Sequence, residues 1–471
     1  MPQLQIGTST GTCSVCGLVY HLVPSTGCLH RHGYSASYPA CSGTGKLPIG
    51  AASDGATGAA PDALDEAMCC SPASPSDSDS ASDDSSPSFT MTPPTFKIIK
   101  RIPRPARHRA GMIFESCLKD VVRLGTLASW RRLFNFASAL RQPSRGGRRI
   151  NLSARILAQL DMFDSGDDSP TAHTSLSSTN QRGRKTARPV NMDKSAASRA
   201  SIKLDLGDVK GAMRILSSDN TYVSPDNNSY SALLAKHPAA PIDRRLPPAI
   251  SSDAFSGSVP QCMSALKSFS PGSASGLDGL SPQHIQDMVQ ASSPEALPKA
   301  LCDFMNLVLA GGVPPLVRPS FFGASLHALR KKDGGLRPIA IGLALRRLAS
   351  KMANKWASSC LLSKLAPRQL GVGVRGGAEA IVHAARAFVA SSSPYHALVK
   401  LDFQNAFNAI RRDCLLESVA VYVPQILPYV LASYGSPSTL VHGPFSLSSA
   451  EGVQQGDPQG PLLFSLAISD A

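Results

Sequence analysis

The sequence predicts an α+β protein in several parts: a small cysteine- and histidine-rich module, linkers, and a larger globular region at the C-terminal end. Three observations lead to this prediction. Hydrophobic residues make up 42% of the 471 residues, which suffices for a sizeable core. Gly and Pro number 37 each, a mix typical of globular parts separated by linkers. In the C-terminal half, apolar residues at helical spacing stand beside a short apolar run typical of a strand.

The charge balance indicates a polyanionic partner. The formal net charge is +14 and the isoelectric point about 9.4, and a basic protein gains affinity for nucleic acid through counterion release. A basic protein without a nucleic-acid role is the alternative. We find no secretory signal and no apolar run of about 18 residues, so we expect an intracellular protein with no membrane partner. In that reducing environment, a tight cysteine pair more often binds metal than forms a disulfide.

The first predicted module spans residues 11–46. It begins with a C-x2-C pair, and thiolate and imidazole groups at such spacing suit a structural, tetrahedral Zn²⁺ site. The candidate ligands are Cys13, Cys16, His30, His32 and Cys41. Cys28 and His21 compete for the third position, so the ligand set stays open. Unrelated thiols in an unstructured terminus are the alternative. A single finger of this kind supports nucleic-acid binding without reading a sequence.

Two linkers and a basic region follow. Residues 47–96 contain eight acidic residues and no Lys or Arg, and we expect them to be disordered. Residues 161–197 form a second expected disordered linker. Between them, residues 97–160 contain 15 Lys or Arg against two acidic residues. Apolar residues at helical spacing predict one or two basic helices there, with Arg-rich arms. We expect nucleic-acid contact, although a charged face is more often simply solvated.

Residues 198–471 form the predicted globular region. One amphipathic helix is expected at the start of the region, from Ile202, Leu206, Val209, Met213 and Leu216. A second helix is expected from Leu345, Leu348, Met352, Trp356 and Cys360, with Arg346, Arg347, Lys351 and Lys355 largely on other faces.

Three further segments carry candidate chemistry. The hairpin segment, Ala328–Ala340, has a Gly-Gly turn between basic residues and could fold over a triphosphate. The carboxylate segment, Leu398–Asn408, places Asp402 at the end of an expected strand, where it could ligate Mg²⁺. The glycine loop, Glu451–Phe464, precedes an apolar helical start and would allow close backbone approach. Each alone reads as an ordinary hairpin, turn or loop.

Taken together and in this order, the segments resemble the reverse-transcriptase domain of non-LTR retrotransposons. The hairpin segment resembles the family's KKDGG-x-RPI, and the carboxylate segment its LDF-x-NAFN. The glycine loop resembles GVQQGDPLGPLLF, with Gln459 where Leu is usual. A further motif, Ser275-Gly-Leu-Asp-Gly-Leu280, resembles GPDGL, with Leu277 in place of Pro. The likeness covers residues 198–471 well and residues 11–46 loosely.

The resemblance implies a right-hand polymerase, of which this chain carries the fingers and part of the palm. Asp402 would be the first of three carboxylates that hold two Mg²⁺ ions. The nucleotide-binding residues would be Lys331, Lys332, Arg337, Phe403, Phe407, Gln455 and Gly456. Among them, Arg337 and the two lysines would neutralise the triphosphate, and Phe407 would exclude a 2′-OH. The implied partners are an RNA template, a DNA target or primer, and deoxynucleoside triphosphates, in the nucleus.

One departure is large. The family places a Tyr-Ala-Asp-Asp strand after the glycine loop, and no such motif follows Phe464 here. We therefore expect a fragment, inactive alone, of an RNA-directed DNA polymerase. The alternative is a non-catalytic, nucleic-acid-binding remnant of a decayed element. A transcription factor would fit residues 1–160 but would leave the three C-terminal segments unexplained.

Overall fold

The computed structural model describes residues 10–12, 19–21, 89, 91, 93–143, 151–166, 192–205, 207–218, 221–393 and 395–469. The chain divides into two compact units, Met1–Ser88 and Phe89–Ala471. In the first unit, β1 (Thr10–Thr12) pairs antiparallel with β2 (Val19–His21). The C-x2-C pair falls between these strands in the sequence. All five candidate zinc ligands lie outside the described residues, so the zinc site remains a prediction.

The second unit contains a five-stranded sheet built around one central strand, β4. Its strands are β3 (Thr221–Val223), β4 (Ala324–Arg330), β5 (Leu336–Gly342), β6 (Ser438–His442) and β7 (Phe445–Ser449). β5 pairs antiparallel with the whole of one edge of β4. On the other edge, β6 runs parallel to the start of β4, and β3 runs antiparallel to its end. β6 continues into β7 as a hairpin whose turn contains Gly443, at φ 58°.

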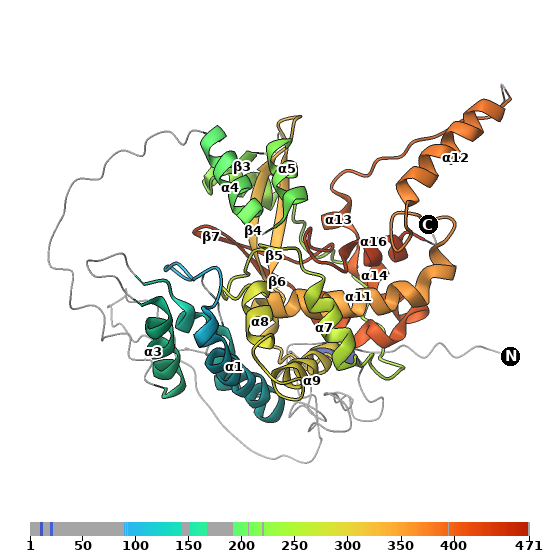
Figure 1. Ribbon diagram of the computed structural model, residues 1–471. Helices are drawn as coiled ribbons and strands as arrows, with labels where there is room; N and C mark the ends of the chain where they lie inside the picture. Colours follow the sequence, from blue (N-terminus) through green and yellow to red (C-terminus); the bar gives the residue numbers. More distant parts are fainter. Residues whose placement is uncertain are drawn as a thin grey trace, which may run out of the picture. The chain divides into compact units, whose positions relative to one another are not determined.

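Helices supply most of the second unit (Figure 1). They are α1 (Arg104–Leu124), α2 (Leu127–Asn135), α3 (Leu152–Asp164), α4 (Met192–Asp205), α5 (Val209–Leu216), α6 (Asn227–Leu234), α7 (Val259–Lys267), α8 (Pro282–Val289), α9 (Leu297–Leu309), α10 (Arg318–Phe321), α11 (Ala344–Leu365), α12 (Gly377–Ser391), α13 (Ala406–Ala409), α14 (Arg412–Tyr422), α15 (Leu427–Tyr434) and α16 (Gly460–Ala467). Short 3-10 helices, η1 (Phe136–Leu140) and η2 (Pro424–Ile426), complete the set. None of the helices in the described ranges is long and apolar enough to cross a membrane.

The basic region is helical, as expected, but it does not stand apart. Gly125 in the left-handed conformation ends α1, and the Thr126 hydroxyl caps the next helix by accepting from the Ser129 amide. The apolar faces of α1–α3 join one core with α8, α9 and α11. The buried Asp287 carboxylate on α8 fixes this packing, because it pairs with Arg101 and Arg107, each at 3.0 Å. Residues 97–160 and the C-terminal helices therefore share one hydrophobic core.

The expected linkers are shorter than the sequence suggested. Phe89 is buried and stacks edge-on against Phe134, with ring centroids 5.5 Å apart, so the first linker ends before residue 96. The second was placed at 161–197, but α3 continues to Asp164 and α4 begins at Met192. Burial of the Phe89 ring against Phe134 explains the first difference, since a buried aromatic side chain contributes a large apolar area to the core. The remaining linker residues lie outside the described ranges.

The expected amphipathic helix at 202–216 is also two helices. Gly207 adopts a φ of 77° and interrupts the helix between α4 and α5. Val209, Met213 and Leu216, predicted to face a core, are each more than half exposed. By contrast, the second expected helix is confirmed as α11, with Leu345, Leu348 and Met352 buried; α11 packs against α7, α9 and α16.

Candidate nucleotide site

The hairpin segment forms the hairpin that its sequence predicted. β4 and β5 pair along their full length, with Leu329 opposite Arg337. At the tip, the Lys331 amide donates to the Gly335 carbonyl at 2.8 Å, and Gly334 takes a φ of 80° that favours glycine. Lys331 is half-buried, whereas Lys332 and Arg337 are exposed. The three cations proposed for a triphosphate therefore lie at or near a solvent-facing tip.

The carboxylate segment does not form the expected strand. Asp402 is exposed, and residues 396–403 have no regular secondary structure and pair with no described strand. Leu398, Val399, Leu401 and Phe403 are 62% to 76% exposed. The apolar pattern alone was insufficient, because a strand also requires a neighbour to complete its hydrogen-bond ladder. The prediction of a strand ending at Asp402 is thus wrong for the structure described.

After Asp402 the chain turns back sharply. Asn405 takes the left-handed conformation, with φ 54° and ψ 29°, and α13 follows directly. The Phe407 ring is half-buried and stacks on Phe464 of α16, with centroids 5.0 Å apart and planes inclined by 24°. Phe407 therefore rests one face on the core, which holds the ring in a fixed orientation next to the glycine loop.

The glycine loop touches both of the other segments through its backbone. The Val453 amide donates to the Phe407 carbonyl at 2.7 Å, and the Ala340 amide donates to the Gln455 carbonyl, also at 2.7 Å. A Cβ at Gly456, which has a φ of 130°, would overlap the Ala340 carbonyl oxygen. Glycine is therefore required where the loop crosses the free edge of β5. Segments far apart in the sequence therefore meet here.

A second glycine, Gly452, allows the loop to pack closely against the turn at residues 405–408. The Gly452 amide donates to the Ile410 carbonyl at 3.0 Å. A Cβ on Gly452 would overlap the backbone of Asn408, and its φ is 68°. Both glycines therefore serve close backbone contact within the protein. Of the two predicted site residues in the loop, Gln455 is half-buried and Gly456 exposed, next to the base of the hairpin.

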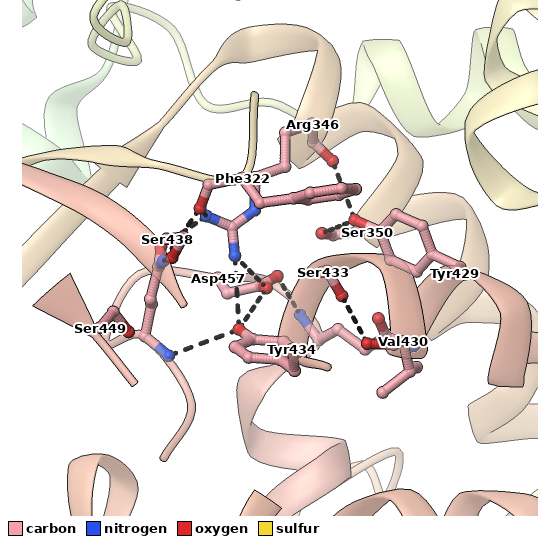
Figure 2. A network of polar contacts seen from close by, with 12 residues as sticks. Phe322, Arg346, Ser350, Tyr429, Val430, Ser433, Tyr434, Ser438, Ser449 and Asp457 are labelled. Atoms are coloured by element: carbon pink, nitrogen blue, oxygen red, sulfur yellow. Dashed lines mark hydrogen bonds and ion pairs between the residues drawn. The ribbon is translucent and has the colours of Figure 1, made fainter. Parts of the chain in front are cut away.

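A buried ionic network holds the loop from beneath (Figure 2). Arg346 of α11 is 1% exposed and pairs with the Asp457 carboxylate at 3.0 Å. The same guanidinium donates to the Gln454 side chain and to the Phe322 carbonyl. The Tyr434 hydroxyl donates to Asp457 at 2.6 Å. Burial raises the pKa of the Tyr434 hydroxyl well above its usual value, so it remains protonated and donates.

A second buried arginine, Arg412 of α14, holds the start of the loop. Its backbone amide donates to the Glu451 carboxylate at 2.9 Å, and its side chain donates to the Gly452 carbonyl at 2.9 Å and the Ser449 hydroxyl at 2.9 Å. Burial lowers the pKa of Arg412 to about 10. The sequence analysis missed both arginines and placed Arg346 outside the core. Their partners lie far away in the sequence, and no local pattern marks them.

The Ser275–Leu280 motif lies against the start of α11. A Cβ at Gly276 would meet the Leu343 backbone at 2.6 Å, so the motif packs closely there. Asp278 is almost fully buried, and its carboxylate accepts from the Leu280 amide at 3.1 Å. Burial raises the pKa of Asp278 to about 7. The nearby Arg347 is half-buried, its desolvation lowers its pKa to about 10, and its guanidinium lies over the Phe269 ring.

The described residues bring together one part of the predicted site. Gln455 and Gly456 adjoin the base of the hairpin, and Phe407 adjoins the loop, while Asp402 and Phe403 lie on an exposed segment without regular secondary structure. Within the described ranges, no group of three or more His, Cys, Asp or Glu side chains could hold a metal ion. The described residues therefore do not assemble a full metal site around Asp402.

Comparison with known proteins adds one relationship. No family profile matches the chain. Over 202 residues, 41% of its length, the chain is 30% identical to the protein named "Retrotransposable element SLACS 132 kDa protein" from Trypanosoma brucei gambiense. The chain covers 16% of that protein's length. The sequence is therefore related to a retrotransposon protein.

Proposed function

We propose that this chain supplies the nucleotide-binding fingers and part of the palm of an RNA-directed DNA polymerase of a non-LTR retrotransposon. One observation supports the proposal above others. Backbone hydrogen bonds from Ala340 to Gln455 and from Val453 to Phe407 join the hairpin, the carboxylate segment and the glycine loop. These are the segments whose sequences resemble the motifs of that family. The reaction would extend a DNA primer on an RNA template.

The roles of the cations follow from their exposure. Arg337 and Lys332 are exposed near the hairpin tip, where a triphosphate could approach from solvent. Guanidinium and ammonium groups form short, charge-assisted hydrogen bonds to phosphate oxygens. Lys331, half-buried, would assist from the other side of the turn. Gln455 and Gly456, beside the base of the hairpin, would line the pocket for the base and sugar.

The metal chemistry would depend on Asp402. Its carboxylate is the kind of hard oxygen ligand that Mg²⁺ prefers. In the family's reaction, Mg²⁺ lowers the charge barrier between the primer hydroxyl and the triphosphate. The described residues place no group of carboxylates around Asp402, so they fit the metal only in part. Phe407 would bound the sugar side, because the core holds its ring in place through Phe464.

A second candidate function is nucleic-acid binding without catalysis, favoured by a different observation. Lys97, Lys100 and Arg104 are exposed at the start of the N-terminal helices, and no ion pair links them to a carboxylate in the described part of the chain. Such a surface would hold phosphates regardless of sequence. This candidate makes the hairpin and Asp402 dispensable, whereas the polymerase proposal requires both.

The binding of a Mg²⁺–deoxynucleoside triphosphate to the full chain tests the proposal. Titration with a fluorescent nucleotide analogue is expected to show saturable binding. Arg337→Glu should weaken it by on the order of tenfold, because a carboxylate would face the triphosphate. Asp402→Asn should remove the Mg²⁺-dependent part of the affinity. Arg155→Glu on α3 is the control, since Arg155 is exposed far from the hairpin in the sequence. Equal affinities in all four proteins would refute the nucleotide site.

A further inference from the structure

The C-terminal end of α6 reaches the turn that follows Asp402. α6 is fixed to the sheet, because the buried His442 ring of β6 hydrogen-bonds to the Ser229 hydroxyl at 3.0 Å and to the Leu326 carbonyl at 2.9 Å. Leu233 is fully buried in the core of the same sheet. α6 ends at Leu234, and Lys236 lies in the turn that follows, where no backbone amide of the described loops and turns donates to its carbonyl oxygen. That oxygen is therefore open to side-chain donors.

Two asparagines of the carboxylate segment supply those donors. The Asn405 side-chain amide donates to the Lys236 carbonyl at 2.9 Å, and the Asn408 amide donates to the same oxygen at 3.2 Å. A carbonyl oxygen has two lone pairs, so both are used. Asn408 is 3% exposed, which makes this partner important for its amide. The turn at 405–408 is thus attached to a helix that belongs to the sheet.

Asn405 also has an unusual backbone. Among the described residues it is the one non-glycine residue with a positive φ. Asparagine tolerates the left-handed region better than most residues, and such conformations persist where surrounding contacts hold them. This conformation lies in the turn between Asp402 and Phe407. The relative placement of the carboxylate and the aromatic ring therefore depends on Asn405.

The chain after Lys236 adds ion pairs on the same side. Residues 236–250 form a strap that runs along the start of α14. Asp243 pairs with Arg411 at 2.9 Å, the Arg245 amide donates to Asp413 at 3.1 Å, and Arg244 lies 3.3 Å from Glu451 of the glycine loop. Hydrogen bonds from Arg411 lower the pKa of Asp413 far below its usual value. The strap therefore contacts both the turn and the loop.

We propose that Asn405 and Asn408 are positioning residues, which hold the turn between Asp402 and Phe407 through the Lys236 carbonyl. This clamp, made of the two asparagine side chains and the Lys236 carbonyl, fixes the positions of the Asp402 carboxylate and the Phe407 ring relative to the glycine loop. This role rests on the proposed nucleotide site, since the clamp matters for chemistry only if a nucleotide binds there. Its ligand class is a Mg²⁺–deoxynucleoside triphosphate. The clamp itself is a property of the fold and can be measured without a ligand.

The test combines two measurements on the full chain. Asn405→Gly retains the left-handed backbone but loses the side-chain amide. Asn408→Leu keeps a similar side-chain volume but also loses the side-chain amide, and the double variant removes both donors. Hydrogen–deuterium exchange of the backbone amides at positions 408, 409, 452 and 453 is expected to rise on the order of tenfold in the double variant. The amides of α9 and of the β4–β5 hairpin are expected to keep their rates. Asn227→Ala, an exposed asparagine of α6, is the matched control.

The second measurement is the preference for deoxyribonucleotides over ribonucleotides, taken as a ratio of binding constants. A clamp that positions Phe407 should lower this ratio in the double variant, whereas a general loss of stability would weaken both ligands alike. Exchange that is unchanged, or that rises uniformly across the protein, would overturn the clamp. Local exchange with an unchanged ratio would overturn its positioning role. If the unaltered chain binds no nucleotide, the proposed function fails, and the exchange data alone decide whether the two amides hold the turn.

Discussion

Gln459 occupies a costly position in the glycine loop. The residue is fully buried, and neither polar atom of its side-chain amide has a hydrogen-bond partner in the described structure. An unsatisfied buried group of this kind costs about 1–3 kcal/mol. The sequences that the loop resembles have Leu at this position. The surroundings of Gln459 offer its side-chain amide no hydrogen-bond partner, so this position suits an apolar side chain.

Gln459→Leu is therefore expected to stabilise the protein by about 1–3 kcal/mol, since an apolar side chain of similar size needs no partner. Denaturant unfolding of the full chain would show a higher midpoint with an unchanged slope. The control is Gln142→Leu, at an exposed position, which should change the free energy of unfolding by less than about 0.5 kcal/mol. Destabilisation by Gln459→Leu would mean that an ordered water or a bound group satisfies the amide.

Asp278 makes the stability of the protein depend on pH. Its pKa is raised to about 7 by burial, from 3.8 for the exposed group. Between these values the folded protein holds a proton that the unfolded chain has released. Stability is therefore greatest below about pH 4 with respect to this group, and it falls as the pH rises towards 7. A shift of this size corresponds to roughly 4 kcal/mol.

Asp278→Asn should remove that part of the pH dependence, because asparagine does not ionise and its carbonyl can still accept from Leu280. The free energy of unfolding of the variant relative to the original chain is expected to rise between pH 4.5 and pH 7.5 (approximate limits of the window). Asp253→Asn, at an exposed position, serves as the control. Parallel pH profiles for the Asp278 variant and the original chain would show that Asp278 is ionised throughout.

Residue type and local spacing predicted some side chains well and others badly. The hairpin cations could be placed because a Gly-Gly turn sets the register of neighbouring positions. Arg346 could not, because its neighbours Leu345 and Arg347 suggest either side of the helix. The partner that buries it, Asp457, is 111 residues away. Burial of a charge is decided by such a distant partner, and sequence periodicity contains no record of it.

At the scale of elements, the Arg346–Asp457 pair joins α11 to the glycine loop. Removing one partner of a buried pair leaves an uncompensated charge, which costs about 3–5 kcal/mol. Asp457→Leu is expected to lower the free energy of unfolding by that amount and to release the loop from α11. The double variant Asp457→Leu with Arg346→Met should recover much of the loss, because neither charge remains. A cost below about 1 kcal/mol for the single variant would show that the pair contributes little.

The N-terminal helices offer a different test, because many of their arginines are already paired. Arg109 pairs with Asp161 and Asp164, and Arg132 pairs with Asp120 and Asp164. Replacing the exposed Lys97, Lys100 and Arg104 with Ala should reduce the slope of log affinity for nucleic acid against log salt by about 2–3. Replacing Arg109 and Arg132 should lower stability and leave that slope nearly unchanged. If both variants keep the salt slope of the unaltered chain, these helices do not contribute to nucleic-acid binding.

Elements defined by local pattern were predicted, and elements defined by a neighbour were not. α11 and the β4–β5 hairpin follow from apolar spacing and turn residues within the segment itself. The expected strand at Asp402 failed, because its ladder requires a second strand that no described element supplies. The break between α4 and α5 was missed, because Gly207 stands inside a stretch with continuous helical spacing.

For the whole molecule, sequence composition predicted separate regions within the second unit, whereas the buried residues join those regions in a common core. Charge separated residues 97–160 from the rest, yet α1–α3 and the C-terminal helices bury their apolar faces together. Asp287, which sits on α8 and accepts from the Ile102 amide at 3.0 Å, joins the two parts. Charge composition reflects the side chains that face solvent, whereas the core is formed by the smaller number of buried apolar residues. The relation to a retrotransposon protein rests on the comparison, and the fold brings together the base of the hairpin, the glycine loop and the turn at Phe407.

The measurement that tests the central claim most directly is RNA-templated extension of a DNA primer with Mg²⁺. The protein expressed from the longest reading frame that contains this chain is expected to incorporate deoxynucleotides, and Asp402→Asn should abolish the incorporation. Residues 1–471 alone are expected to show none, because Asp402 is the single carboxylate that the resemblance assigns here, and two metal ions require more. Absence of RNA-dependent synthesis by the longer protein, or synthesis that survives Asp402→Asn, would contradict the account.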